Sequence, residues 1–168
     1  EYAMATRYVP ADADRLLEQA LQPTEQQNVF VLFASNTEVK QMEVKVQATQ
    51  MLAQMAWGRI VNLLETRFHL IYFDTPGSQN AGLLDLALST SDLAMIITDP
   101  DSVYNQQETV TTTDKCRMVM NMQNPELKVG IVLNKVDGRT SEQVVAEKSR
   151  EMVSLVADEL GSEVHALG

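Results

Sequence analysis

One stretch decides the predicted fold: His69-Leu70-Ile71-Tyr72-Phe73-Asp74-Thr75-Pro76-Gly77, an apolar run that ends in an acid, a proline and a glycine. Such a run predicts a buried parallel strand over residues 69–74, with Asp74 presented at its carboxyl end. Open α/β sheets bind ligands at this end of their strands. An acid followed closely by Pro76 and Gly77 suits a magnesium-linked water and a loop that approaches a phosphate.

Length and composition set the broad class. The 168 residues suffice for one domain with a sizeable core, and the net charge of −10 disfavours a nonspecific nucleic-acid surface. The single cysteine, Cys116, has no pairing partner within the chain, which suits a reducing compartment. No apolar run reaches the length of a membrane span and no signal-peptide pattern is present, so we expect a cytoplasmic protein. Because the sequence begins at Glu1 rather than at a methionine, it is expected to be a fragment or to lack a segment.

Helical and strand patterns alternate on both sides of the 69–74 stretch. The patterns predict helices over 11–21, 44–55, 59–66, 81–88, 102–123 and 141–160, and further strands over 28–34, 92–98, 128–134 and 163–167. This alternation predicts an α/β fold with a mostly parallel, doubly wound sheet and helices on both faces, a three-layer α/β/α arrangement. Residues 1–27 are expected to form an N-terminal extension with one helix, and residues 28–168 the main domain.

Polar residues follow four of the predicted strands. They are Ser35-Asn36, Asp74-Thr75, Thr98-Asp99 and Asn134-Lys135-Val136-Asp137. On adjacent parallel strands these ends would line one crevice. The Asn-Lys-x-Asp corner suits a purine base, because the Asn134 amide can bond the base and Asp137 can accept from an exocyclic amine. The alternative is that both corners are ordinary strand ends and turns, the second marked by Asp137-Gly138.

Three runs together, FHLIYFDTPG, LLDLALSTSDLAMIITDP and KVGIVLNKVDGR, resemble the ParA/MinD family of deviant P-loop ATPases. The resemblance covers residues 28–168 and implies a P-loop NTPase-like nucleotide-binding domain. It also implies ATP and Mg²⁺ as cofactors, ATP-driven homodimerisation, slow hydrolysis, and release from a surface or partner. The implied role is positioning or partition of a plasmid, of pilus or secretion machinery, or of cell-pole cargo, through a protein partner or cargo adaptor. Nonspecific DNA is a further family partner, which the net charge disfavours.

The resemblance also assigns site residues. Asp74 becomes the catalytic residue, orienting a magnesium-bound water, and Gly77 becomes the sensor of the γ-phosphate. An ungapped overlay places Asn36 and Gln41 at the two lysines of the family's phosphate loop, and Met42 at its magnesium-binding hydroxyl. The full set of candidate cofactor-binding residues is Ser35, Asn36, Lys40, Gln41, Met42, Pro76, Gly77, Asn134 and Asp137. For Lys40, the competing interpretation is a solvated surface lysine.

Two departures from the family pattern concern the phosphate loop and the switch region. The loop over residues 35–43 contains no glycine, and Glu38 and Glu43 add negative charge where a triphosphate would lie, so the loop as written should bind ATP poorly. The family also has a second acid-ended strand and a switch segment, where this chain has only residues 56–67. Either the chain is a nucleotide-free relative with a reduced sheet, or internal residues are missing.

Three functions therefore remain open. The first is a nucleotide-dependent positioning ATPase, and the second is a GTPase-like switch, since the Asp74 and Asn134 corners also fit the third and fourth GTPase motifs in order. The third is a catalytically silent relative that serves as a scaffold or adaptor. Cys116 is expected to have no chemical role, the nine methionines to fill the core or form an interaction face, and His69 and His165 to bind no metal.

Overall fold

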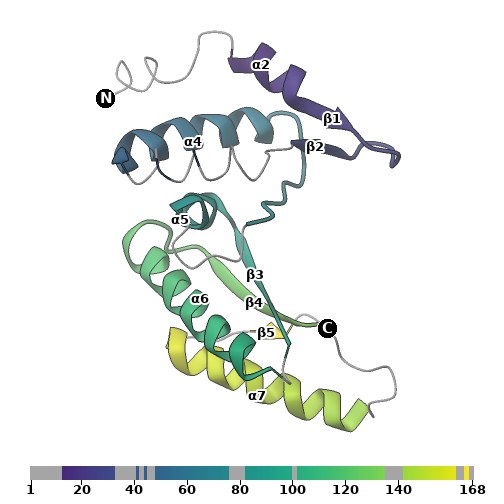
Figure 1. The fold of residues 1–168 in the computed structure, drawn as a ribbon, viewed down its shortest axis with the longest axis vertical. Helices are drawn as coiled ribbons and strands as arrows, with labels where there is room; N and C mark the ends of the chain where they lie inside the picture. The colour runs from purple at the N-terminus through teal and green to yellow at the C-terminus, as the bar shows by residue number, and fades with distance from the viewer. Residues whose placement is uncertain are drawn as a thin grey trace. The chain divides into compact units, whose positions relative to one another are not determined.

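The computed structural model describes residues 13–32, 41, 44, 48–75, 82–99, 102–134, 142–161 and 165–166 (Figure 1). The chain divides into two compact units, and helix α5 (Gly82–Thr90) contributes to both. The first unit consists of the chain up to Thr75 together with the first part of α5, to Leu86. The second unit includes the chain from Ala87 onward. The predicted boundary between residues 27 and 28 stays a prediction.

A short hairpin follows the first helix, α2 (Ala13–Ala20). Strand β1 (Leu21–Pro23) pairs antiparallel with β2 (Phe30–Leu32). The connecting loop is closed by the Thr24 amide, which donates to the Val29 carbonyl oxygen at 3.0 Å. Asn28 in this loop has a φ of 65°, a left-handed conformation that asparagine tolerates better than most residues. The predicted 28–34 strand therefore exists, but it pairs with its sequence neighbour rather than in a parallel sheet.

Helix α4 (Gln50–Glu65) is continuous, although the sequence pattern predicted two helices over this region. Its buried residues, Val61 and Leu64, lie three residues apart on one face. Met51, in the first turn of the helix, is 68% exposed. Two aromatic pairs form around the helix: Phe68 packs against Phe30 of the hairpin, and Phe73 packs against Trp57 of α4, with ring centroids 5.6 and 5.1 Å apart.

The prediction of a strand over residues 69–74 is wrong. Residues 68–75 form no strand, and Leu70 and Tyr72 are 66% and 73% exposed. A parallel strand inside a sheet would be covered on both faces. Here Phe73 contacts a helix through its ring, which gives this segment a packing partner without any strand ladder.

The second unit contains a parallel β-α-β-α-β arrangement. Its elements are β3 (Leu93–Thr98), α6 (Val103–Met122), β4 (Lys128–Leu133), α7 (Glu142–Leu160) and β5 (His165–Ala166). The strand order is β3-β4-β5, with all neighbours parallel. The predicted elements over 81–160 are thus confirmed to within a few residues at each end.

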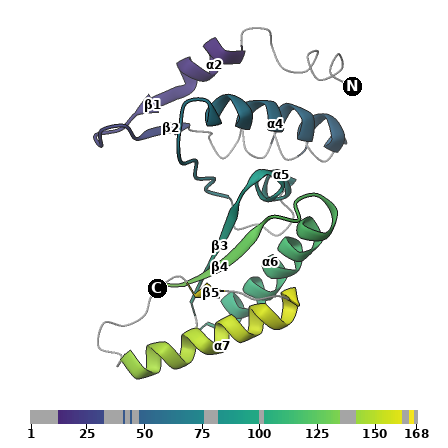
Figure 2. The same cartoon turned by 180° about the vertical axis from the view of Figure 1, so that it is seen from behind.

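Both crossover helices of the second unit lie on one face of its sheet (Figures 1 and 2). Helix α6 packs against β3 and α7, and α7 packs against β4 and β5. Two right-handed crossovers that step in the same direction across a sheet place their helices on the same side. Side chains of β3 alternate between the two faces of the sheet. Ile96 and Thr98 are buried, so the face that they share with Ala94 is the inner one. The other face carries Leu93, Met95 and Ile97.

The predicted fold class needs correction. In the described part of the chain there is no large, doubly wound sheet with helices on both faces, but a two-stranded antiparallel sheet and a three-stranded parallel one. The physical reason lies in the two strands expected at residues 28–34 and 69–74. The first closes a local hairpin, which costs little loop entropy, and the second forms no ladder.

Side-chain hydrogen bonds stabilise the ends and the middle of the second unit's helices. The Asn124 amide donates to the carbonyl oxygens of Leu88 and Ser91 at 3.0 and 2.9 Å, at the end of α5 and just beyond it. The three consecutive threonines of α6 are weak helix formers, yet Thr111 and Thr113 each donate to the carbonyl four residues earlier. The helix nevertheless runs unbroken through these threonines.

Candidate functional site

The carboxyl edge of the parallel sheet is where the sequence placed its ligand-binding residues. Strands β3 and β4 end at Thr98 and Leu133, which are partners in the ladder. The backbone N–H of Asn134 extends that ladder by donating to the Thr98 carbonyl oxygen at 2.8 Å. Asp99 and Asn134 therefore follow neighbouring strands at one edge, as predicted for the Thr98-Asp99 and Asn134 corners.

A chain of hydroxyl groups attaches this edge to helix α6. The Oγ1 atoms of Thr98 and Thr109 lie 2.8 Å apart, and Thr109 Oγ1 lies 2.7 Å from the Asn105 carbonyl oxygen. A carbonyl can only accept and a hydroxyl has one proton, so Thr109 donates to Asn105 and accepts from Thr98. Both threonines are almost fully buried. Ser102 completes the junction as the N-cap of α6, accepting from the Asn105 amide at 3.3 Å.

These hydroxyls hold the junction between β3 and α6 together. Thr98 and Thr109 satisfy each other and a helix carbonyl, and Ser102 satisfies a helix amide. They therefore fix the position of the loop after β3. Just beyond the two strands lie the partly exposed Asp99 and the exposed Asn134.

The predicted nucleotide-binding residues are described only in part. Ser35, Asn36, Lys40, Met42, Pro76, Gly77 and Asp137 lie outside the described residues. Gln41 is an exposed helical residue, and Asp74 is exposed on the strand-free segment of the first unit. Asn134 belongs to the second unit. The roles predicted for Asp74 at a magnesium-bound water and for Asn134 at a base stay predictions.

Within the described ranges, no three histidine, cysteine, aspartate or glutamate side chains gather into a group that could hold a metal ion.

Cys116 is fully buried in α6. Burial raises the pKa of the Cys116 thiol from its ordinary 9.0 to about 11, since a thiolate is poorly solvated inside the protein, and a backbone hydrogen bond offsets only part of that rise. The thiol is therefore protonated at neutral pH and is a poor nucleophile.

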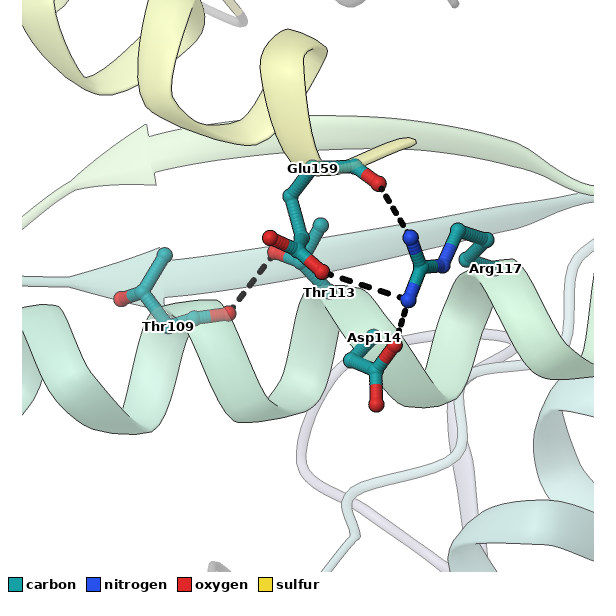
Figure 3. Close-up of polar contacts among 5 residues, drawn as sticks. All are labelled: Thr109, Thr113, Asp114, Arg117 and Glu159. Carbon is teal, nitrogen blue, oxygen red and sulfur yellow. Dashed lines mark hydrogen bonds and ion pairs between the residues drawn. The ribbon is translucent and has the colours of Figure 1, made fainter. Parts of the chain in front are cut away.

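A cluster of charges joins α6 to the end of α7 (Figure 3). The Arg117 guanidinium donates through Nη1 to the Glu159 carbonyl oxygen at 3.3 Å, and its Nη2 lies 3.4 Å from Glu159 Oε1. The same Nη2 pairs with Asp114 on α6. A cation bound to a carbonyl in the last turn of a helix compensates the negative end of the helix dipole. The cluster therefore stabilises the end of α7.

Strand β3 carries an exposed apolar surface that its sequence does not reveal. Leu93, Met95 and Ile97 are 45%, 45% and 66% exposed, whereas the intervening Ile96 is buried. Because the strand is apolar at five of its six positions, its sequence shows no alternation of polar and apolar residues that would mark the exposed side. We call these three residues the β3 surface.

Comparison of the chain with protein-family models, with curated proteins and with solved structures gave no match. None of the described helices is both long enough and apolar enough to cross a membrane.

Proposed function

We propose that this chain acts through protein association, as a scaffold or adaptor, and that the β3 surface is its contact site. The observation that carries the proposal is the exposure of Leu93, Met95 and Ile97 on a strand whose alternate residues Ile96 and Thr98 are buried. Contiguous apolar side chains on a folded protein are commonly interaction sites. The cytoplasmic location expected from the sequence belongs to this proposal, whereas the homodimer implied by the family resemblance belongs to the nucleotide-dependent alternative.

Site-specific photo-cross-linking tests it. A benzophenone amino acid placed at Ile97 should give a discrete protein adduct in extracts of the source cells. The same amino acid at Met122, equally apolar and 74% exposed but on α6, is the matched control and should not. No adduct at Ile97, or the same adducts at both positions, would contradict a specific association surface on β3.

Nucleotide-dependent positioning is the second candidate function. Its support is the resemblance to ParA/MinD ATPases together with the position of Asn134 beside Asp99, at the edge where parallel sheets bind ligands. ATP with Mg²⁺ is the proposed cofactor, and GTP is the alternative. The glycine-free loop over residues 35–43 argues against tight binding of either.

Calorimetry with ATP and GTP in the presence of magnesium separates these possibilities. Binding of ATP that is weakened in Asp74→Ala would support the ATPase. A preference for GTP that disappears in Asp137→Ala would support the GTPase-like switch. If neither nucleotide binds, both nucleotide-dependent functions are excluded and the adaptor function stands alone.

A further inference from the structure

Resting on the proposed association through the β3 surface, we propose that the partner of this chain is an extended peptide segment. It adds a strand to the edge of β3 opposite β4, where no described strand pairs with β3. The segment has alternating apolar residues and carries lysine or arginine at its ends. The binding mode is β-augmentation, in which backbone hydrogen bonds give affinity and alternate side chains give specificity.

The backbone groups of the β3 surface point away from the rest of the sheet. Lys128 N donates to Asp92 O at 3.0 Å and Asn134 N to Thr98 O at 2.8 Å, so the even-numbered residues of β3 direct their backbone groups to β4. In a parallel ladder, successive residues alternate between the two neighbouring sides. The amide and carbonyl groups of Leu93, Met95 and Ile97 therefore face the outer edge. There, among the described residues, no strand pairs with β3.

The same residues expose apolar side chains. An added strand that bonds the edge would also cover part of Leu93, Met95 and Ile97, so backbone pairing and apolar burial occur together. Free edges are usually blunted by charged residues, proline or bulges. The sequence of β3, Leu-Ala-Met-Ile-Ile-Thr, contains no charge, proline or glycine.

Charge selects the partner. Asp92 and Asp99 lie immediately before and after β3. Lys128 is on β4, on the opposite side of β3 from the open edge. Basic residues at the two ends of an added strand would lie near the two aspartates, which favours association and speeds it.

A second copy of the chain fits this edge less well. Antiparallel pairing of β3 with itself, centred on Met95, places Leu93 opposite Ile97. It also brings Asp92 of one copy to within one ladder position of Asp99 of the other, at both ends. Each copy adds a net charge of −10. Like charges therefore oppose self-pairing at the ends of the strand.

The test uses the full chain and a fluorescent heptapeptide of alternating valine and threonine with an arginine at each end. Binding is followed by fluorescence anisotropy. We expect Met95→Pro, which removes an outward amide, to weaken binding by at least about tenfold. Its matched control, Met95→Thr, keeps the amide and should lose less. Asp92→Asn should weaken binding by about threefold to fivefold, and Asp158→Asn on α7 should not change it.

Amide hydrogen exchange provides a readout that does not depend on variants. In the free protein the amides of Leu93, Met95 and Ile97 should exchange faster than those of Ala94 and Ile96, which bond to β4. Bound peptide should protect the first set. If the first set is already protected in a dilute monomer, a segment of the same chain covers the edge and the proposal is wrong. If protection rises with protein concentration, the occupant is a second copy and the proposal is also wrong.

The outcome for the peptide and the outcome for the function can be told apart. A peptide with glutamate in place of both arginines should bind more weakly than the basic one, and equal binding would overturn the charge selection. If neither peptide binds but cross-linking at Ile97 still captures a discrete protein, this proposal fails and the association function stands. If cross-linking at Ile97 also gives nothing, both fail.

Discussion

At the scale of single residues, the buried threonines of the second unit decide how β3 meets α6. The buried hydroxyls of Thr98 and Thr109 are hydrogen-bonded to each other, and the Thr109 hydroxyl donates to the Asn105 carbonyl oxygen. Removing the partner of a buried hydroxyl lowers the free energy of unfolding by more than the hydrogen bond contributed, because the hydroxyl cannot bond to water in its place. The junction at the carboxyl edge of the sheet therefore depends on a few polar atoms.

Replacing Thr109 with valine tests this junction. Thr109→Val keeps the side-chain shape but leaves the Thr98 hydroxyl without an acceptor, so we expect the free energy of unfolding to fall by about 1–3 kcal/mol. Thr111→Val is the matched control, because Thr111 makes the same kind of bond on the same helix at a more exposed position. It should cost below about 0.5 kcal/mol. Equal costs in urea denaturation would contradict the argument.

The Cys116 thiol makes stability depend on pH in a defined window. The unfolded thiol loses its proton near pH 9, whereas the folded one keeps it until about pH 11. Its contribution to stability is therefore complete below pH 9 and is lost as the pH rises to about 11, up to about 3 kcal/mol. Unfolding measured at about pH 8 and about pH 10 should show a larger loss in wild type than in Cys116→Ala. Equal losses would show that the folded thiol titrates normally.

At the scale of the elements, the end of α7 is set by backbone conformation as well as by Arg117. Gly161 follows the helix with a φ of 65° and its amide donates to Ala157 O at 2.8 Å. This is the left-handed position at which glycine commonly ends a helix. Gly58 lies inside α4, where the backbone needs no such freedom.

Substitution of these two glycines should have opposite effects. A Cβ would meet no atom within 4 Å at either position, so only the backbone term differs. We expect Gly161→Ala to destabilise the protein by about 1 kcal/mol and Gly58→Ala to stabilise it by about 0.5–1 kcal/mol. Thermal unfolding of both variants measures this. The same sign for both would show that steric contacts, not backbone conformation, control these sites.

At the scale of the whole molecule, the chain divides into two compact units. Units with their own internal packing can open separately. The Thr109→Val change lies in the second unit, whereas α4 lies in the first.

Hydrogen exchange can detect this separation. In Thr109→Val we expect the amides of β4 to exchange faster, because the β3–α6 junction is weakened, while the amides of α4 keep their wild-type rates. Thr111→Val should leave both sets unchanged. Faster exchange throughout α4 would indicate that the two units unfold as one.

By itself the sequence determined where the helices and strands of residues 82–160 begin and end, because apolar periodicity, the Ser102 cap and the end of α7 near Gly161 are local signals. It also placed Asn134 at the carboxyl end of a parallel strand. Only the tertiary structure decided that residues 30–32 pair in a hairpin, that residues 69–74 form no strand, and that Leu93, Met95 and Ile97 are exposed. The reason is that an apolar run specifies burial or pairing without specifying its partner. The partner depends on the competition between local loop closure and contacts far apart in the chain.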